Sequence, residues 1–457
     1  MAQPNSLAEA HLISAAEAAR EGSQEAGSAQ PPGSAEAAAA SAASPGATDW
    51  SRWLIVALLG IGAVIAYCDR TNISAVLAYR PFVEHFQLSD VGRGVLNSAF
   101  FWSYMLLQIP AGWLVDRYGT KIPYAISFAI WCVSSAVTGM TRTLPELTTL
   151  RVITGAGEAI VTPASFRWMR QHFQEQQAGL AIGIYMLGTK IGPAVGVPIA
   201  TWLIHWYDWR LMFLGMGAVG MIWLVPWLLL VKNDAPLAPK ISSQPVSRET
   251  VPFGNILASP VIWGTVIINF CYNYFVFYCM TWMPAYFVEQ RHVSLTKMGL
   301  YSFFSFAGIA IVALVSGIAA DFLIKRGGNA VTVRKAFVVA GFAIACTEVI
   351  GVHAATVDGA LFWAVVSLSG LGLTTANNVA LCRMTLIPAP AAGLATGVQN
   401  VSTSLAGIVG PILSGWLLQT TGGYAAPMMA IFFFLVVGAV TCIVLLRPKW
   451  SPKVVIV

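Results

Sequence analysis

Residues 52–78 read RWLIVALLGIGAVIAYCDRTNISAVLA, and this stretch decides the class of the fold. A helix needs about 20 predominantly apolar residues to cross the roughly 30 Å hydrocarbon core of a bilayer, and the stretch is longer than that. Asp69 and Arg70 nevertheless lie inside it, where an ionisable side chain costs roughly 2.5–3.5 kcal/mol on insertion scales. Because a stable fold does not require such charges, they indicate a polar cavity within a bundle of membrane helices.

The rest of the chain has the same apolar character. Of its 457 residues, 57% are hydrophobic and 10% are charged, and the mean hydropathy is +0.69. A soluble domain carries roughly 25% charged residues, so this composition excludes the soluble class. The apolar runs are continuous and lack the alternation of barrel strands, which favours helices. We predict an all-α membrane protein with twelve transmembrane helices, at 52–78, 94–115, 121–140, 145–168, 178–204, 211–231, 259–288, 298–324, 335–353, 359–384, 393–418 and 424–446.

Basic residues are distributed unevenly over the loops of this twelve-span map. The two tails and the even-numbered loops carry sixteen Lys and Arg, whereas the odd-numbered loops carry six. The positive-inside rule then places both termini in the cytoplasm. We therefore expect a multi-pass membrane protein with both termini on the cytoplasmic side. The net charge of +6 follows from this distribution and does not indicate nucleic-acid binding.

Composition also divides the chain into regions. Residues 1–48 are rich in Ala, Ser, Glu and Gly and cannot bury a core, so we expect a disordered cytoplasmic tail. The longest polar break between spans, 232–258, is expected to be a cytoplasmic linker. It separates an N-terminal six-helix bundle, 49–231, from a C-terminal one, 259–447, and residues 448–457 form a second cytoplasmic tail.

The two halves repeat features at corresponding positions. The stretch from Gly112 to Gly119 follows span two, and the stretch from Gly317 to Asp321 ends span eight, with Lys325 and Arg326 after it. The dipeptide Gly192-Pro193 in span five is matched by Gly410-Pro411 in span eleven. Such correspondence predicts two duplicated bundles with a central site between halves that rock against each other.

Four stretches carry a resemblance to a known family. The loop GWLVDRYGTK, 112–121, resembles the signature of the major facilitator superfamily. The stretches YCDRTNIS (67–74), RVITGAGEA (151–159) and NFCYNYFVFYCMTWMPAYFVEQRH (269–292) resemble the anion:cation symporter family within it. That family includes sugar-acid transporters of the galactonate and glucarate type and is related to vesicular organic-anion carriers. The resemblance covers about 50–447 and implies transport by alternating access.

Two pairs of opposite charges form the predicted centre. Adjacent helical residues point about 100° apart, so Asp69 and Arg70 need not neutralise each other. Arg151 and Glu158 are seven residues apart and lie within about 20° of one helix face. The resemblance implies that Arg70 binds the substrate carboxylate, that Arg151 serves coupling and gating, and that Asp69 and Glu158 carry protons. Structural ion pairs within the bundle remain the alternative for both pairs.

Proximity of these groups would couple anion and proton binding. A neighbouring arginine favours the charged form of a carboxylate, whereas burial disfavours it. Loading an anion at Arg70 or Arg151 would therefore change the proton affinity of Asp69 and Glu158, and linkage makes the effect reciprocal.

Lys190 is a departure from the family pattern. It lies in span five, where sugar-acid members usually carry uncharged polar residues. Its ammonium could meet a second carboxylate or a polyol, which would favour a dianion. Alternatively, it extends to the interface or pairs with Glu158.

The C-terminal half offers neutral polar groups instead of charges. Amides and hydroxyls inside apolar helices suit a hydroxyl-rich substrate, although helix–helix hydrogen bonds are an equally good explanation for each residue. The predicted contacts in this half, with Asn400 favoured by the resemblance, are Tyr274, Asn377, Asn378, Gln399 and Asn400, and Tyr67 of span one is predicted to join them. The charged loop residues Asp116, Arg117, Asp321 and Arg326 are expected to act as conformational latches.

Function classes follow from these residues. We expect a secondary active transporter that moves an organic anion, such as an aldonate or aldarate, together with protons across the bilayer. An organic-anion antiporter or uniporter is the alternative, and a non-transporting anion sensor is a third reading. No GxxxxGK[ST] motif, nucleophile–base cluster or metal-ligand spacing occurs, so we expect no enzyme, metal, nucleotide or cofactor, with the proton gradient as energy source. The monomer is expected to be the working unit.

Overall fold

The computed structural model describes residues 49–173, 175–232 and 249–456. The predicted tail 1–48 and most of the predicted linker, 233–248, lie outside the described residues. The chain forms two units, Met1–Arg52 and Trp53–Val457. All the structure discussed below belongs to the second unit, apart from the first turn of the first described helix.

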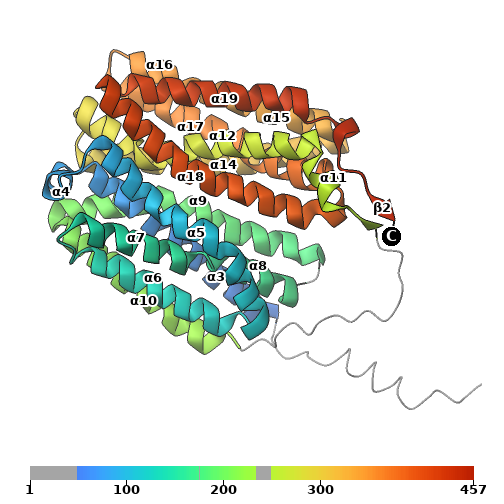
Figure 1. Ribbon diagram of the computed structural model, residues 1–457, viewed down its shortest axis with the longest axis horizontal. Helices are drawn as coiled ribbons and strands as arrows, with labels where there is room; N and C mark the ends of the chain where they lie inside the picture. The colour runs from blue at the N-terminus through green and yellow to red at the C-terminus, as the bar shows by residue number, and fades with distance from the viewer. Residues whose placement is uncertain (1–48, 174, 233–248, 457) are drawn as a thin grey trace, which may run out of the picture. The chain divides into compact units, whose positions relative to one another are not determined.

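Helices account for almost all of the described chain. The N-terminal half contains α3 (Asp49–Leu77), α4 (Arg80–His85), α5 (Asp90–Tyr118), α6 (Lys121–Thr138), α7 (Leu144–Glu158), α8 (Val161–His172), α9 (Glu175–Trp206) and α10 (Trp209–Leu230). The C-terminal half contains α11 (Phe253–Leu257), α12 (Pro260–Thr281), α13 (Met283–Ala285), the π-helical η1 (Tyr286–Gln290), α14 (Leu295–Lys325), α15 (Ala330–Ala345), α16 (Glu348–His353), α17 (Val357–Ala380), η2 (Leu381–Thr385), η3 (Ala389–Ala391), α18 (Ala392–Thr421), α19 (Ala425–Leu445) and η4 (Pro448–Trp450). Figure 1 shows the long helices running side by side.

The twelve predicted spans are confirmed within the described residues. Ten helical segments are long and apolar enough to cross a membrane by length and composition. The other two spans are α5, which carries polar residues along its length, and the α7–α8 pair. All-helical architecture is therefore what the apolar runs impose.

Span four is broken, although the sequence predicts one helix over 145–168. Helix α7 ends at Glu158 and α8 begins at Val161. Pro163 lacks the N–H that would bond the carbonyl of Ala159, and its ring crowds that carbonyl. The break leaves Glu158 as the last residue of α7, deep within the N-terminal half.

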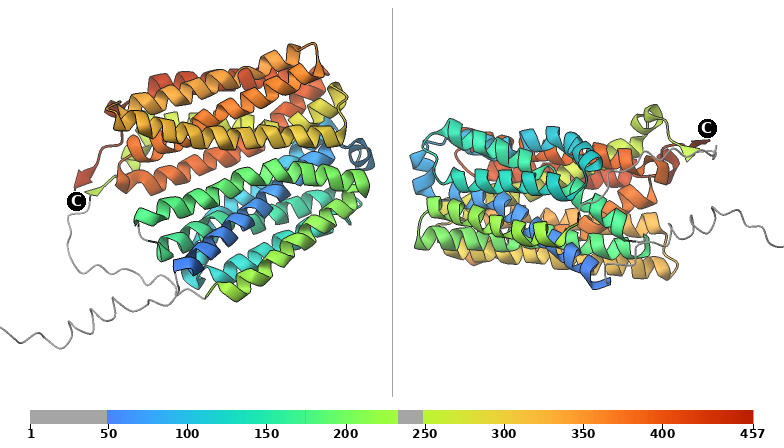
Figure 2. Two further views of the ribbon diagram at one scale, coloured as in Figure 1. Left: turned by 180° about the vertical axis from the view of Figure 1, so that it is seen from behind. Right: turned by 90° about the horizontal axis from the view of Figure 1, so that it is seen from below.

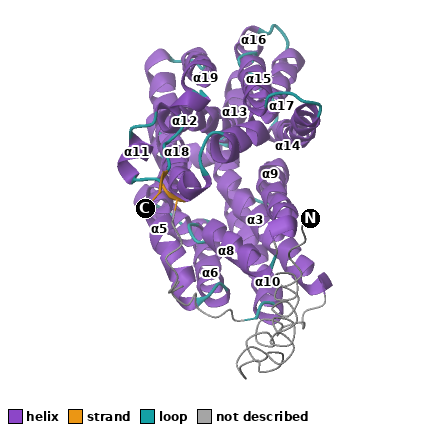
Figure 3. Cartoon of the chain, turned by 90° about the vertical axis from the view of Figure 1, so that its right-hand side faces the viewer, coloured by secondary structure: helices purple, strands orange, loops and turns teal. Residues whose placement is uncertain are grey.

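The helices form two groups that are visible when the molecule is viewed along them. Figure 3 shows α12, α14, α15, α17 and α19 on one side and α3, α6, α8 and α10 on the other. We call the group formed by α3 to α10 the N-bundle and the group formed by α12 to α19 the C-bundle. The turns between helices lie at two ends, which we name by the loop numbering of the sequence. The odd-loop side holds α4 and α16, and the even-loop side holds α11 (Figure 1).

Small residues allow helices to approach closely within the N-bundle. Gly188, Gly192 and Gly196 recur every four residues along α9 and meet α3 at Gly60, Tyr67 and Cys68, with no room for a Cβ atom. Such stripes bring membrane helices together, because packing and hydrogen bonds, not water exclusion, join them. The stripe holds α9 against the part of α3 that carries Asp69 and Arg70. Lys190 belongs to α9 as well, so it is held near these charges.

The two bundles also meet closely near the odd-loop side. A Cβ atom at Gly94 of α5 would collide with the backbone of Pro411 in α18, and one at Gly415 would collide with that of Asp90. Figure 2 shows the two groups of helices from behind and from below.

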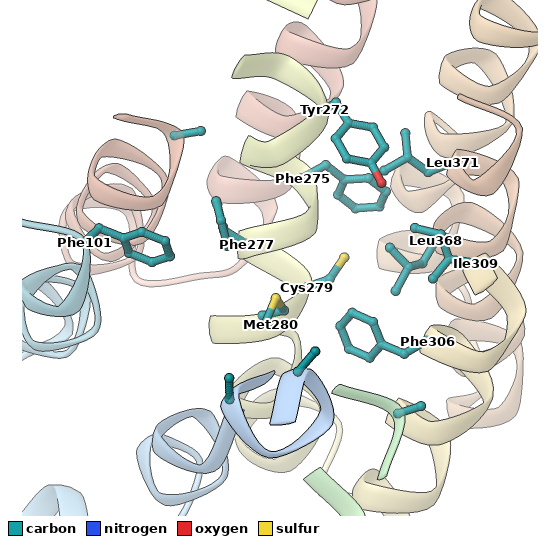
Figure 4. Packing of buried hydrophobic residues seen from close by; sticks show 14 of the residues in the cluster. Phe101, Tyr272, Phe275, Phe277, Cys279, Met280, Phe306, Ile309, Leu368 and Leu371 are labelled. Atoms are coloured by element: carbon teal, nitrogen blue, oxygen red, sulfur yellow. The ribbon is translucent and has the colours of Figure 1, made fainter. Parts of the chain in front are cut away.

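Aromatic and aliphatic side chains fill the C-bundle between α12, α14 and α17. Figure 4 shows Phe275, Phe306, Leu368 and Leu371 converging there, while Phe101 of α5 points toward Phe277 of α12. The rings of Phe101 and Phe277 lie 4.7 Å apart between centroids and join the two bundles. Apolar packing therefore surrounds the place where the polar groups meet.

A short sheet is present that the sequence does not predict. Strand β1 (Glu249–Thr250) pairs antiparallel with β2 (Val455–Ile456), with Glu249 opposite Ile456. Each strand has two residues, too few for any periodic pattern. The pairing ties the segment before α11 to the C-terminal end of the chain.

Candidate functional site

A small pocket lies where the bundles meet, and two arginines line it. Its volume is about 10 Å³, close to the space that one water needs. We call it the arginine pocket, and its lining residues are Arg70, Ser74, Asn97, Phe100, Phe101, Arg151, Phe277, Met280 and Thr281. A larger groove of about 630 Å³ lies between α9 and α14, lined by residues such as Trp202 and Leu300. The lining of this groove is mostly apolar, and its single charged residue, Lys297, is exposed on the odd-loop side. The arginine pocket, with two arginines between the bundles, is therefore the better candidate.

Arg70 is held in an aromatic and acidic environment. Its Nε donates to Glu158 Oε2 at 2.7 Å. Its guanidinium lies over the rings of Tyr67, Phe100 and Tyr104, at 4.5, 5.0 and 4.6 Å from their centroids. Cation–π contacts of this kind stabilise a guanidinium and set its plane. The arginine is thus positioned before any ligand arrives.

Arg151 is a buried cation without a direct ion-pair partner among the described residues. Its exposure is 4%, and its guanidinium lies 5.5 Å from the centroid of the Phe100 ring. Among the described residues it has no hydrogen-bond or ion-pair partner, and its Nε is a buried donor left unsatisfied. A buried charge normally finds a partner, since its burial is otherwise costly. The pocket therefore has the electrostatics of an anion site.

Asp69 faces away from this pocket, into the N-bundle. Trp131 Nε1 donates to its Oδ2 at 2.8 Å, and Ser135 Oγ donates to its Oδ1 at 3.2 Å. Asn72 Nδ2, one helical turn along α3, also donates to Oδ1 at 3.2 Å. No described cation lies within ion-pair distance of the carboxylate. Neutral donors, not arginine, hold Asp69.

Glu158 pairs across helices instead of along its own. The sequence places Arg151 and Glu158 on one face of a helix, but the ion pair joins Glu158 of α7 to Arg70 of α3. Glu158 is fully buried at its side chain, and its Oε1 has no hydrogen-bond partner among the described residues. The sequence left open whether these charges form structural ion pairs. In the structure Asp69 and Arg70 do not pair with each other, whereas Arg70 pairs with Glu158.

Lys190 lies near the same group of residues. It is half-buried on α9, close enough to Tyr67 to interact with it electrostatically. It has no ion pair or hydrogen bond with the described residues, so it does not pair with Glu158. The N-bundle thus contributes Tyr67, Arg70, Arg151 and Lys190 to one region.

The predicted residues of the C-bundle are less concentrated. Tyr274 is buried, with its hydroxyl 3.4 Å from Ser414 Oγ and its ring against Phe434. Asn377 and Asn378 are buried in α17, where Asn377 Nδ2 donates to Leu373 O and Asn378 Oδ1 accepts from Cys382 Sγ. None of the three lines the arginine pocket.

Residues of α18 and α12 form a polar group within the C-bundle. Gln399 Nε2 donates to Thr265 Oγ1 at 3.1 Å, and Asn269 Nδ2 donates to Thr403 Oγ1 at 2.6 Å. Asn273 Nδ2 also donates to Thr403 Oγ1, at 3.3 Å. Asn400 is half-buried beside them in sequence and has no side-chain hydrogen bond with the described residues.

Sequence reasoning missed the polar contact that joins the bundles at the pocket. Asn97 Nδ2 of α5 donates to Thr281 Oγ1 of α12 at 2.6 Å, and both residues line the arginine pocket. Ser74, one helical turn after Arg70, lines it as well. Two signals in the sequence could have found these residues. Asn97 is an isolated amide within the apolar run 94–115, and Ser74 follows Arg70 at helical spacing.

The predicted latch residues make contacts within their own bundles. Asp116 pairs with Arg167 of α8 at 3.3 Å, and Asp321 pairs with Arg334 of α15 at 2.8 Å. The guanidiniums of Arg117 and Arg326 lie over aromatic rings of their own helices, Trp113 and Phe322.

Charges that join the two bundles lie on the odd-loop side instead. Arg93 of α5 is 3% exposed, and its Nη2 lies 2.8 Å from Glu289 Oε1 in η1. Tyr424 donates to the other oxygen of Glu289 at 2.6 Å, and Asp90 contacts Arg93 Nη1 at 3.2 Å. Arg93 also donates to the carbonyl of Leu77. These contacts close the odd-loop side.

In the part of the chain that the structure describes, no group of three or more His, Cys, Asp or Glu converges. The polar centre consists of guanidiniums, carboxylates, hydroxyls and amides.

Comparison with known proteins gives the family. Residues 59–402 match the Major Facilitator Superfamily. The D-galactonate transporter of Escherichia coli O6:H1 is 28% identical over 418 residues, covering 86% of this chain and 95% of the relative. The probable galactarate/D-glucarate transporter of Escherichia coli K12 is 26% identical, covering 86% of this chain and 93% of the relative. The chloroplastic ascorbate transporter of Arabidopsis thaliana is 28% identical, covering 85% and 74%.

A solved structure supports the fold. The bacterial homologue of the human lysosomal transporter Spinster, in an inward-facing and occupied conformation, has a TM-score of 0.72 at 17% identity. The match covers 89% of this chain and 100% of that one. With twelve spans in two bundles and a family match over most of its length, the chain belongs to the major facilitator superfamily and is a multi-pass membrane transporter, not an enzyme.

Proposed function

We propose that this transporter carries a small organic anion together with protons by alternating access. One observation supports this proposal above the others. Arg151 is buried and unpaired beside Arg70 in a pocket between the two bundles. A carboxylate would supply a direct ion-pair partner and hydrogen bonds for Arg151, because guanidiniums bind carboxylates through two parallel N–H donors.

The class of anion is a carboxylate with hydroxyl groups, such as an aldonate or an aldarate. Relatives named for D-galactonate and for galactarate/D-glucarate align over most of the chain. Asn97 and Thr281 at the pocket offer an amide and a hydroxyl to such a substrate. Lys190, half-buried and without an ion pair among the described residues, adds a cation that favours a diacid.

Coupling would operate through the ion pair of Arg70. In the structure Glu158 occupies that guanidinium, so a substrate carboxylate must compete with it. Protonation of Glu158 removes the competing charge and frees Arg70 for the anion. By linkage, anion binding then favours protonation by the same factor. Asp69, held by neutral donors, is the second proton carrier in this scheme.

The membrane orientation predicted from the sequence lets us assign a conformational state to the structure. With the tails and even-numbered loops in the cytoplasm of a bacterial inner membrane, the closed odd-loop side faces outward. The latch charges Asp116 and Asp321, paired inside their bundles on the even-loop side, leave the halves free to separate there. The structure would then represent the inward-facing state. In this proposal the monomer is the working unit, the proton gradient is the energy source, and no cofactor takes part.

Uptake into proteoliposomes tests the proposal. Purified protein is reconstituted, and radiolabelled galactonate, glucarate and succinate are offered with and without an inward proton gradient. We expect uphill accumulation of at least one hydroxylated acid that disappears with a protonophore. Asp69→Asn should abolish accumulation while preserving exchange of labelled for unlabelled anion.

Two results would point elsewhere. Accumulation that persists without a proton gradient but requires a counter-anion inside would identify an antiporter. Equilibration without accumulation would identify a uniporter. Arg151→Ala serves as the binding control, since it should weaken anion binding in all three cases.

A further inference from the structure

The hydrogen bonds around Asp69 distinguish its two oxygens. Oδ2 accepts from Trp131 Nε1 at 2.8 Å, and Oδ1 lies 3.2 Å from both Ser135 Oγ and Asn72 Nδ2. All four residues are buried, with exposures of 4% or less. Water therefore has little access to the carboxylate in this conformation, and these partners determine how each of its protonation states is satisfied.

The partners differ in what they can do when a proton arrives. An indole N–H can only donate, whereas a serine hydroxyl donates or accepts and an asparagine side chain has both an N–H₂ and a carbonyl. A proton on Oδ2 would face the Trp131 N–H, donor against donor. A proton on Oδ1 would find the hydroxyl of Ser135, which can rotate to accept it.

Asn72 supplies an independent observation. Its Oδ1 is buried and has no hydrogen-bond partner in the described structure. A buried carbonyl without a donor is costly, and this one lies on the amide that already contacts Asp69. Turning that amide by 180° brings its oxygen to Asp69 Oδ1, where a proton on the carboxyl would satisfy it.

We propose that Trp131 is a positioning residue that keeps Asp69 Oδ2 an acceptor in both protonation states, so that Oδ1 is the atom that takes up and releases the proton. One O–H bond forms at Oδ1 with a proton delivered by water of the transport pathway. This single O–H donates to one of the two partners, so either the Ser135 hydroxyl rotates or the Asn72 amide turns to accept it, while the other partner remains a donor. The inference rests on the proposed function, because it specifies how the proton carrier Asp69 works.

Other ionisable groups near Asp69 do not take over this role. Arg151 and Glu158 of α7 act on the carboxylate electrostatically, and the thiols of Cys132 on α6 and Cys68 on α3 are its titratable neighbours. None of these four donates a hydrogen bond to Asp69 in the structure. The direct contacts are those of Trp131, Ser135 and Asn72.

The sharpest experiment uses Trp131→Phe with Trp223→Phe as its matched control. Both tryptophans belong to one aromatic stack with Phe128, but Trp223 Nε1 donates to the carbonyl of Leu58 instead of Asp69. Ser135→Ala has a similar control in Ser134→Ala, because Ser134 contacts Thr154 and not Asp69.

Two measurements are made on the reconstituted full-length protein. The first is the infrared carboxylic-acid C=O band that Asp69→Asn removes. If Oδ2 is the carbonyl oxygen bonded by Trp131, the band moves to higher wavenumber in Trp131→Phe and stays in place in Trp223→Phe. The second is the pH profile of proton-driven uptake. Losing a donor to the ionised form should move its alkaline limb upward by about one unit in Trp131→Phe only.

The outcomes separate the inference from the function it rests on. If the wild type does not accumulate any anion with a proton gradient, the proposed function fails. If it does accumulate and the Asp69 band is identified, an unmoved band in Trp131→Phe overturns the inference. A band shifted to higher wavenumber in Trp131→Phe, with anion exchange retained, supports the inference. If the band shifts less in Ser135→Ala than in Trp131→Phe, that result supports the assignment of the proton to Oδ1.

Discussion

The two bundles of this transporter treat polarity differently. The N-bundle buries Asp69, Arg151 and Glu158 and largely covers Arg70, and a single direct ion pair joins two of these four among the described residues. The C-bundle places neutral amides and hydroxyls of α12 and α18 in contact with one another. Similar apolar helices thus carry charge in one half and neutral hydrogen-bonding groups in the other.

One residue departs from this division. Glu348 is a buried acid of the C-bundle, and Ser367 donates a hydrogen bond to it. It does not line the arginine pocket. The difference between the bundles therefore concerns the charges at the pocket: binding and proton coupling are proposed to depend on the N-bundle, and selectivity for substrate shape on the C-bundle.

The strongest test of this comparison removes Arg70. Arg70→Ala deletes the anion contact and leaves Glu158 buried without its partner, so uptake should fall by more than 100-fold. Breaking a buried ion pair on one side costs about 3–5 kcal/mol when the remaining charge is retained. The expected result is lost uptake together with a lower melting temperature in detergent.

The double variant Arg70→Ala/Glu158→Gln separates the two effects. Removing the orphaned charge should recover thermal stability without restoring uptake. Wild-type affinity in this double variant would show that the anion binds elsewhere, and the division between the bundles would then be wrong.

The sequence predicts the spans well because apolar length alone determines them. It does not predict which prolines break a helix. Pro193 and Pro198 lie inside α9, which continues through both, whereas span four breaks just before Pro163. Whether a helix continues past a proline depends on what satisfies the freed carbonyl, and that partner is a tertiary feature.

The sequence predicts which charged residues belong to the site, but it does not predict which of them form ion pairs or hydrogen bonds with each other. Expensive charges identify Arg70 and Glu158, but these residues are 88 positions apart, and only packing of α3 on α7 shows that they meet. The direction of Asp69, away from the pocket and toward Trp131, is similarly invisible in helical spacing. Predicted contacts such as Tyr274 and Asn378 are instead buried within the C-bundle, since in-bundle hydrogen bonds and binding contacts use the same residue types.

A second prediction concerns the charges that connect the bundles. Glu289→Gln removes the anionic partner of Arg93 on the odd-loop side, at a site where Glu289 is partly exposed. The closed odd-loop side should become about tenfold less favoured relative to the open one. Spin labels at the exposed residues Met140 and Ala355 should report a larger population of long distances.

The control for this prediction is Glu84→Gln. Glu84 pairs with Arg80 within α4 alone, so its loss should leave the distance distribution unchanged. An unchanged distribution in Glu289→Gln as well would mean that apolar packing, such as Phe101 against Phe277, closes this side without help from charge.

The smallest expected effect tests the neutral half. Asn400→Ala removes a half-buried amide without a hydrogen bond among the described residues, one that we propose to meet a substrate hydroxyl. A neutral hydrogen bond contributes about 0.5–1.5 kcal/mol, so affinity for a polyhydroxy acid should fall roughly two- to tenfold. Affinity for a carboxylate without hydroxyls should not change. Asn378→Ala, whose amide is engaged with Cys382, should lower stability without altering this ratio, and an equal loss for both substrates in Asn400→Ala would remove the C-bundle from selectivity.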